Sequence, residues 1–247
     1  MQNYCKTIGA LAAASALVAG NANAGVEYNL HAGYSSEYLF RGRDLGKDLV
    51  ESGLDASTEV NGFSLSAGIW NGTYGTGNNG GRNNTNLSDI DQEVDFYGAV
   101  SKDLGFATAS VGYIAYTYPG VASGNSQEVS LGLSRDLGFA KASLTYFASV
   151  ANEANGNNDG YSELALSRSF ELSPCLSLGV ATNIGYLVDR GQDTAWTTKV
   201  ALDYGFAEHA KLSPFVTYAV ALSNVGNSYY NNTENEFVAG SMVSVSF

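Results

Sequence analysis

The chain has 247 residues, of which only 15% are charged, and its 24 acidic residues outnumber its 12 basic ones, giving a formal net charge of −12. A soluble protein of this size usually carries about 25% charged residues, so an ordinary soluble domain is disfavoured. The acidic balance and the lack of a basic stripe exclude a nucleic-acid partner.

The N-terminus predicts a secretory signal peptide over residues 1–24. Lys6 supplies a positive charge, residues 8–18 form a short apolar run, and Ala22-Asn23-Ala24 has the small residues of a cleavage site. Residues 25–247 would then form the exported domain. None of its apolar runs reaches the roughly 18 residues of a transmembrane helix.

The exported domain alternates between apolar and polar residues over segments of roughly ten residues. In one of them Val200 and Leu202 share a face, while Lys199 and Asp203 share the other. This alternation is typical of an antiparallel sheet with one apolar and one polar side. About twelve strands are predicted, with ten to fourteen left open. In chain order they are 26–41, 49–60, 63–71, 91–102, 106–118, 126–135, 139–150, 160–171, 175–188, 193–204, 212–222 and 235–247.

Short turns alternate with longer polar connections along the chain, as in outer-membrane barrels. Asn61-Gly62 suits a two-residue hairpin turn in which both residues have positive φ. Residues 42–48 are interpreted as a short connection on the longer-loop side. The pattern predicts an all-β, antiparallel up-and-down transmembrane β-barrel in the bacterial outer membrane. A secreted β-sandwich would show the same strands but not the regular order of short and long connections.

Aromatic residues concentrate near the predicted strand ends, as expected of two girdles at the membrane interfaces. Beside the short turns these residues are Phe63, Phe106, Phe139, Phe170 and Phe206, and toward the longer loops they include Tyr38, Tyr74, Tyr116, Tyr161, Tyr186 and Trp196. The chain ends in Phe247 on an alternating strand. This ending resembles the assembly signal of bacterial outer-membrane proteins, and it predicts outer-membrane lipid and the barrel assembly machinery as partners.

Acidic residues dominate the polar face that is predicted to line the lumen. Asp91, Glu93 and Asp95 alternate along one strand, which places them on one face about 7 Å apart. The full set of predicted pore-lining residues is Arg41, Asp55, Glu59, Asp91, Glu93, Asp95, Glu128, Lys141, Lys199 and Asp203. An acidic lumen would favour cations. Alternatively, these groups pair across the lumen and plug it.

Two further features bear on this choice. Small inward residues, such as Gly68, Gly112, Gly185 and Gly240, argue that the interior is not fully packed. Arg41, near the loop rim, could set a constriction by facing the acids across the lumen. It could instead anchor the rim by pairing with one acid.

Residues for catalysis are scarce. The sequence holds two histidines, His31 and His209, and neither has neighbours suited to nucleophilic or metal chemistry. We therefore expect no enzymatic activity, no metal site and no cofactor.

The segment Tyr34–Gly42, with the sequence YSSEYLFRG, resembles the first-strand segment of the TorF-like porin family. Ala67-Gly68-Ile69-Trp70 and Asp91–Gly98 are further points of similarity, and the resemblance covers about residues 33–113. It implies an outer-membrane barrel with a porin role and without catalytic residues. The expected function is passive diffusion of small hydrophilic solutes, with cations favoured. The alternative is a non-conducting barrel with a plugged lumen that acts through its loops.

Overall fold

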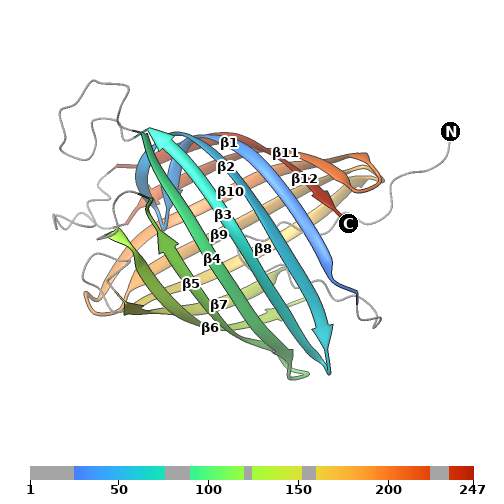
Figure 1. Cartoon of the computed structure of the whole chain (residues 1–247), viewed down its shortest axis with the longest axis horizontal. Helices are drawn as coiled ribbons and strands as arrows, with labels where there is room; N and C mark the ends of the chain where they lie inside the picture. The colour runs from blue at the N-terminus through green and yellow to red at the C-terminus, as the bar shows by residue number, and fades with distance from the viewer. Residues whose placement is uncertain (1–24, 76–89, 120–123, 152–159, 223–233) are drawn as a thin grey trace.

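The computed structural model describes residues 25–75, 90–119, 124–151, 160–222 and 234–247, and in them the chain forms a closed barrel of twelve β-strands (Figure 1). Each strand pairs antiparallel with its neighbours in sequence, and the first pairs with the last. The predicted fold is confirmed, while the predicted signal peptide lies outside the described residues. The strands are β1 (Glu27–Phe40), β2 (Arg43–Val60), β3 (Phe63–Gly75), β4 (Ile90–Asp103), β5 (Thr108–Thr117), β6 (Ser126–Asp136), β7 (Lys141–Ala151), β8 (Gly160–Ser173), β9 (Leu176–Leu187), β10 (Gln192–Ala207), β11 (Ala210–Ala221) and β12 (Glu236–Ser246).

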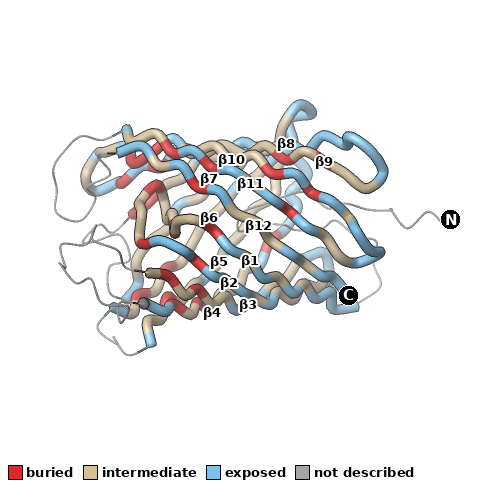
Figure 2. The backbone as a smooth tube through the Cα atoms, turned by 90° about the horizontal axis from the view of Figure 1, so that it is seen from above, coloured by how far each residue is buried: buried red, intermediate tan, exposed pale blue. Residues whose placement is uncertain are grey.

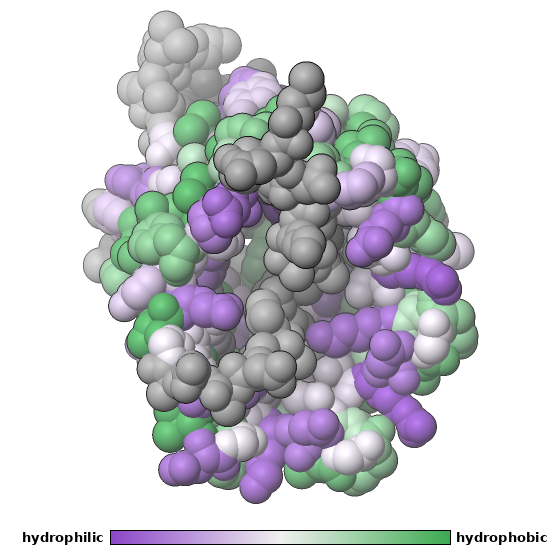
Figure 3. Space-filling model, turned by 90° about the vertical axis from the view of Figure 1, so that its right-hand side faces the viewer, coloured by the Kyte–Doolittle hydropathy of each residue, from purple (hydrophilic) through white to green (hydrophobic). Residues whose placement is uncertain are grey.

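Alternation along each strand sends apolar side chains to the outside of the barrel. On β4, Phe96 and Val100 are exposed, whereas Glu93 and Asp95, at positions of the opposite parity, are buried. The tube in Figure 2 shows exposed positions alternating with intermediate or buried ones along many strands. Seen from one end, hydrophobic side chains lie on the outer wall and many hydrophilic ones turn toward the centre (Figure 3). This outer surface suits lipid. No helix among the described residues is long and apolar enough to cross a membrane.

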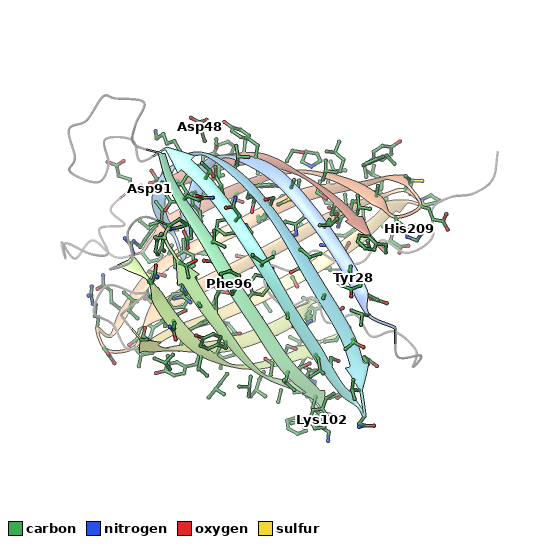
Figure 4. All side chains as sticks on the ribbon, in the orientation of Figure 1. Tyr28, Asp48, Asp91, Phe96, Lys102 and His209 are labelled. Carbon is green, nitrogen blue, oxygen red and sulfur yellow. The ribbon has the colours of Figure 1, made fainter. Side chains whose placement is uncertain are left out.

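The turns that follow β2, β4, β6, β8 and β10 and the paired chain ends gather at one end of the barrel. Backbone hydrogen bonds of 2.9 and 3.0 Å join Tyr28 and Phe247, whose rings also stack with centroids 5.7 Å apart. In Figure 4, Tyr28 and His209 lie toward this end, and Asp48 and Asp91 lie at the other. The C-terminal residue thus fastens β12 to β1 where the barrel closes.

Residues 42–48 were predicted to be a connection, and this prediction is wrong. Arg41 and Gly42 both adopt positive φ, 52° and 80°, so two residues suffice for the turn. Pairing resumes at once, with Phe40 opposite Arg43, and β2 therefore begins six residues earlier than the sequence suggested. Asn61-Gly62 forms the same kind of turn, with φ of 53° and 76°, as predicted.

The β1–β2 hairpin leaves the barrel wall before its tip. The ladder between β1 and β12 ends at Ser35, and beyond Val50 the ladder between β2 and β3 shifts register. Within the described residues, positions 38–46 form ladder pairs only with one another, and Glu37 pairs with Lys47. A bulge after Tyr38 and a positive φ at Asp48 bend the two strands there. We call residues 36–47 the inner hairpin; it lies at the left end of the barrel in Figure 1.

Glycines on the inner face leave less open space than predicted, because neighbouring side chains lie over them. A Cβ at Gly68 would come within 2.5 Å of the Tyr97 ring, and a Cβ at Gly185 within 2.3 Å of the Tyr161 hydroxyl. The expectation of an unfilled interior, drawn from residue size alone, is therefore wrong at these positions. Aromatic rings on adjacent strands use the room that the missing side chains provide.

Gly240→Ala is expected to destabilise the barrel at its closing seam. Its Cβ would lie 2.5 Å from both the Phe215 ring and the backbone oxygen of Tyr34, which cannot move without disturbing the β1–β12 ladder. Overpacking of this kind costs about 1–3 kcal/mol. Urea unfolding of the protein refolded in lipid vesicles measures the loss. Gly205→Ala is the matched control, since its Cβ would lie 3.9 Å from the backbone oxygen of Cys175, an ordinary contact distance; equal stability of the two variants would contradict the prediction.

Candidate functional site

Arg41 reaches across the barrel from the tip of the inner hairpin. Its guanidinium group donates hydrogen bonds of 2.9 and 2.8 Å to the two carboxylate oxygens of Glu128 on β6. Strand β6 stands five positions from β1 around the barrel, so only a path through the lumen can join the two residues. The side chains are 6% and 0% exposed. The predicted constriction residue thus forms a buried ion pair with the opposite wall.

Three aromatic residues of the wall also contact this ion pair. The guanidinium carbon lies 4.5 Å from the Phe147 ring centroid and 4.2 Å from that of Tyr161. The Tyr116 hydroxyl donates a 2.9 Å hydrogen bond to Glu128. Tyr116, Glu128, Phe147 and Tyr161 come from the consecutive strands β5, β6, β7 and β8, and we call them the wall site.

The backbone at the hairpin tip is strained, and the contacts of Arg41 with the wall site must offset the cost of that strain. A residue other than glycine at positive φ costs of order 1–3 kcal/mol, and Arg41 has a φ of 52°. Breaking a buried ion pair by removing one partner typically costs about 3–5 kcal/mol. Phe40 adds an edge-on ring contact with Tyr116, at 5.8 Å between centroids. The balance favours a tip that rests against the wall site.

A second cluster lies on β4, where Glu93 and Asp95 share the inner face. They are 1% and 7% exposed, and one oxygen of each, Glu93 Oε2 and Asp95 Oδ1, has no hydrogen-bond partner within the described part of the chain. The Tyr118 hydroxyl donates a 3.1 Å hydrogen bond to Glu93. Burial and the neighbouring charge of Glu93 raise the pKa of the Tyr118 phenol, so it remains a proton donor. A nearby cation would stabilise both carboxyl groups in their ionised forms, because burial and mutual repulsion otherwise favour protonation.

The inner hairpin packs beside this acidic pair. Tyr38 of the hairpin contacts Tyr74 of β3, with ring centroids 4.9 Å apart, and both side chains are buried together with Leu49. Trp70 packs against the same cluster and donates a 2.8 Å hydrogen bond to Glu51. The hairpin is thus held by its base on β3 as well as by its tip on the wall site.

Two further acidic residues have partners elsewhere in the lumen. Asp55 accepts a 2.5 Å hydrogen bond from Tyr97, and His31 Nδ1 lies 3.4 Å from its other oxygen. Asp203, which is 1% exposed, pairs with Lys211 at 3.5 Å. Alternation places Lys211 on the inner face of β11, although Lys211 was not among the predicted pore-lining residues.

Comparison with known proteins places the chain in a family. Residues 19–237 match the model of a family described as bacterial protein of unknown function (Gcw_chp). The chain belongs to this Gcw_chp family. No curated protein sequence matches it. Two parts of the resemblance to TorF-like porins are supported: the chain belongs to a bacterial family, and it folds as a barrel. Membership of the TorF-like family itself stays a prediction.

Solved structures similar to the Gcw_chp chain include outer-membrane barrels of different activities. The KdgM porin in complex with disordered oligogalacturonate has 11% identity and a TM-score of 0.52, over 90% of this chain and 99% of that one. The COG4313 outer membrane channel from Pseudomonas putida F1 has 9% identity and a TM-score of 0.57, over 92% and 97%. Outer membrane phospholipase A from Escherichia coli has 12% identity and a TM-score of 0.51, over 90% of each chain. At these identities the similarity shows the fold alone.

The remaining predicted pore-lining residues of the Gcw_chp chain do not join the two clusters. Asp91 and Glu59 are exposed near opposite ends of the barrel, and Lys141 is half-buried at the start of β7, opposite Asp136. The Lys199 ammonium lies 3.8 Å from the Phe215 ring centroid. Of the predicted pore-lining residues, the structure therefore joins Arg41 with Glu128 and places Glu93 beside Asp95 on one strand. The other predicted residues lie outside these two clusters. Their role in lining a pore stays a prediction.

The predicted loop-side aromatic girdle is partly wrong. Tyr186 and Trp196 are exposed on the outer surface, but Tyr38, Tyr74, Tyr116 and Tyr161 are buried. Proximity to a strand end says nothing about which face a side chain takes, whereas alternation does. Tyr161 is two residues from Glu163 on β8, and it therefore shares the inner face with that carboxylate. This signal would have revealed the aromatic part of the wall site.

Proposed function

We propose that this barrel is an outer-membrane channel through which small hydrophilic solutes diffuse passively, with cations favoured. The observation that carries the proposal is the buried acidic pair, Glu93 and Asp95, with an unpartnered oxygen on each residue. A low-dielectric wall around uncompensated carboxylates concentrates cations and repels anions. Acidic residues also outnumber basic ones on the inner faces: the acids include Glu51, Asp55, Glu128, Glu163 and Asp203, and the bases include Arg41, Lys199 and Lys211.

The proposed location rests on the outer surface and the chain ends. Large hydrophobic side chains are exposed around the barrel, including Phe96 and Leu131, and outer-membrane lipid would cover them. Residues 1–24 have the pattern of an export signal. Phe247, at the end of β12, is the residue that we propose as the signal for the barrel assembly machinery. The similar solved structures that are channels support the same location and function.

The second candidate function is a non-conducting barrel that acts through its loops. The inner hairpin favours this second candidate, because the ion pair between Arg41 and Glu128 holds a segment of the chain across the lumen. The two candidates differ in one property, which is whether solutes pass through the wild-type barrel.

Swelling of liposomes that contain the refolded protein tests the channel. We expect proteoliposomes placed in an isotonic solution of a small neutral sugar to swell faster than protein-free liposomes, because the sugar enters and water follows. A cationic solute of similar size should enter faster than an anionic one. Correctly folded protein that leaves swelling at the protein-free rate would rule out the diffusion channel and favour the second candidate.

A further inference from the structure

The wall site is complete without the residue that occupies it. Glu128 is 0% exposed with Arg41 in place, and Tyr116 donates a hydrogen bond to it from the neighbouring strand β5. Phe147 and Tyr161 pack together, with ring centroids 6.0 Å apart. All four residues belong to the continuous wall formed by β5, β6, β7 and β8. Arg41 belongs to a different part of the molecule and enters from the lumen side.

The contacts that Arg41 makes are those by which proteins recognise a guanidinium ion. Two N–H groups meet the two oxygens of one carboxylate at 2.9 and 2.8 Å, which is the fork geometry that an ammonium ion cannot copy. The faces of Phe147 and Tyr161, within 4.5 Å of the guanidinium carbon, add cation–π attraction. Carboxylate and rings together form an enclosure that fits a planar cation.

We propose that the wall site is a binding site for the guanidinium group of a small solute and that Arg41 is its tethered occupant. The proposal deepens the proposed channel function by naming a class of solute that the lumen recognises. Its physical basis, the contacts of Arg41 with the wall, does not depend on conduction. A solute with a guanidinium group enters the site when the hairpin tip leaves it.

Tethering sets how tightly a free guanidinium ion binds to the wild-type protein. A group held by a short tether competes at an effective concentration of millimolar or more. Wild-type protein should therefore bind free guanidinium weakly, and a variant without the Arg41 side chain should bind it more tightly. Glycine is a suitable replacement, because it tolerates the positive φ of this turn.

The experiment is calorimetric titration of Arg41→Gly, refolded in detergent, with methylguanidinium chloride. We expect Arg41→Gly to bind methylguanidinium saturably and at least about tenfold more tightly than the wild type. The double variant Arg41→Gly/Glu128→Gln should bind it at least about tenfold more weakly than Arg41→Gly. Tetramethylammonium chloride, which lacks N–H donors, should not saturate the site. Arg41→Gln is titrated in parallel, so a folding failure of one variant leaves the other to decide.

Two results would overturn the proposal. One is a folded Arg41→Gly barrel, shown by heat-modifiable migration on a gel, that binds no methylguanidinium. The other is binding that Glu128→Gln leaves unchanged or that tetramethylammonium matches. Conductance of the same samples separates this proposal from the channel function. A barrel that binds methylguanidinium but never conducts would refute the channel and keep the site, whereas a barrel that conducts without binding would do the reverse.

Discussion

Arg41→Gly is expected to raise the open-channel conductance of the barrel in a planar bilayer. The change removes the ion pair with Glu128 and the two ring contacts that hold the hairpin tip across the lumen. Loss of one partner of a buried ion pair costs about 3–5 kcal/mol, which would shift the ratio of closed to open hairpin by about two orders of magnitude or more. Single-channel recordings should therefore show larger or longer openings than in the wild type.

Two control variants test whether the rise in conductance comes from the loss of the Arg41–Glu128 ion pair or from a general loss of positive charge. Lys47→Ala removes a cation from the same hairpin, and Lys47 makes no ion pair within the residues described. It should conduct like the wild type. Arg41→Lys keeps the charge but loses the paired hydrogen bonds, so its conductance should be intermediate. If Arg41→Gly conducted no more than Lys47→Ala, the hairpin tip would not limit passage.

The double variant Glu93→Gln/Asp95→Asn is expected to lose most of the cation preference. Both side chains are buried, and each has one oxygen without a hydrogen-bond partner among the described residues. A cation roughly 4 Å from a carboxylate gains about 4 kcal/mol at an effective dielectric constant of about 20. The reversal potential in a KCl gradient should consequently move toward zero, while the conductance remains measurable.

Glu208→Gln is the control for that change. Glu208 is an exposed acid in the short turn between β10 and β11, so its replacement removes one negative charge, half the change made by the double variant, and leaves the lumen unchanged. It should keep the wild-type reversal potential. A double variant that kept the wild-type preference would show that selectivity arises elsewhere, for example at the exposed loops.

The fold could be predicted because each strand repeats one simple rule. Alternation along β4 placed Glu93 and Asp95 inside and Phe96 outside, and the structure agrees. The same rule placed Glu128 inside. The partner of Glu128 was beyond prediction, because Arg41 lies 87 residues away and several acids share its face of the barrel. Only the bend of β1 and β2 selects Glu128 among them.

The inner hairpin was missed for a local reason. Residues 42–48 include glycines, aspartates and charged side chains, which are typical of a connection. A polar strand that crosses a lumen needs no apolar face, so it lacks the alternation that identified the wall strands. Its turn also carries arginine at a positive φ, where asparagine or glycine is the usual signal. The residue with this unusual φ, Arg41, is also the one whose side chain holds the hairpin tip against the wall site.

Single-channel conductance of the refolded wild-type protein in a planar bilayer, under a KCl gradient, tests the channel function most directly. We predict discrete conductance steps with a reversal potential on the cation-selective side. A folded barrel that inserts and never conducts, in the wild type and in Arg41→Gly alike, would contradict it.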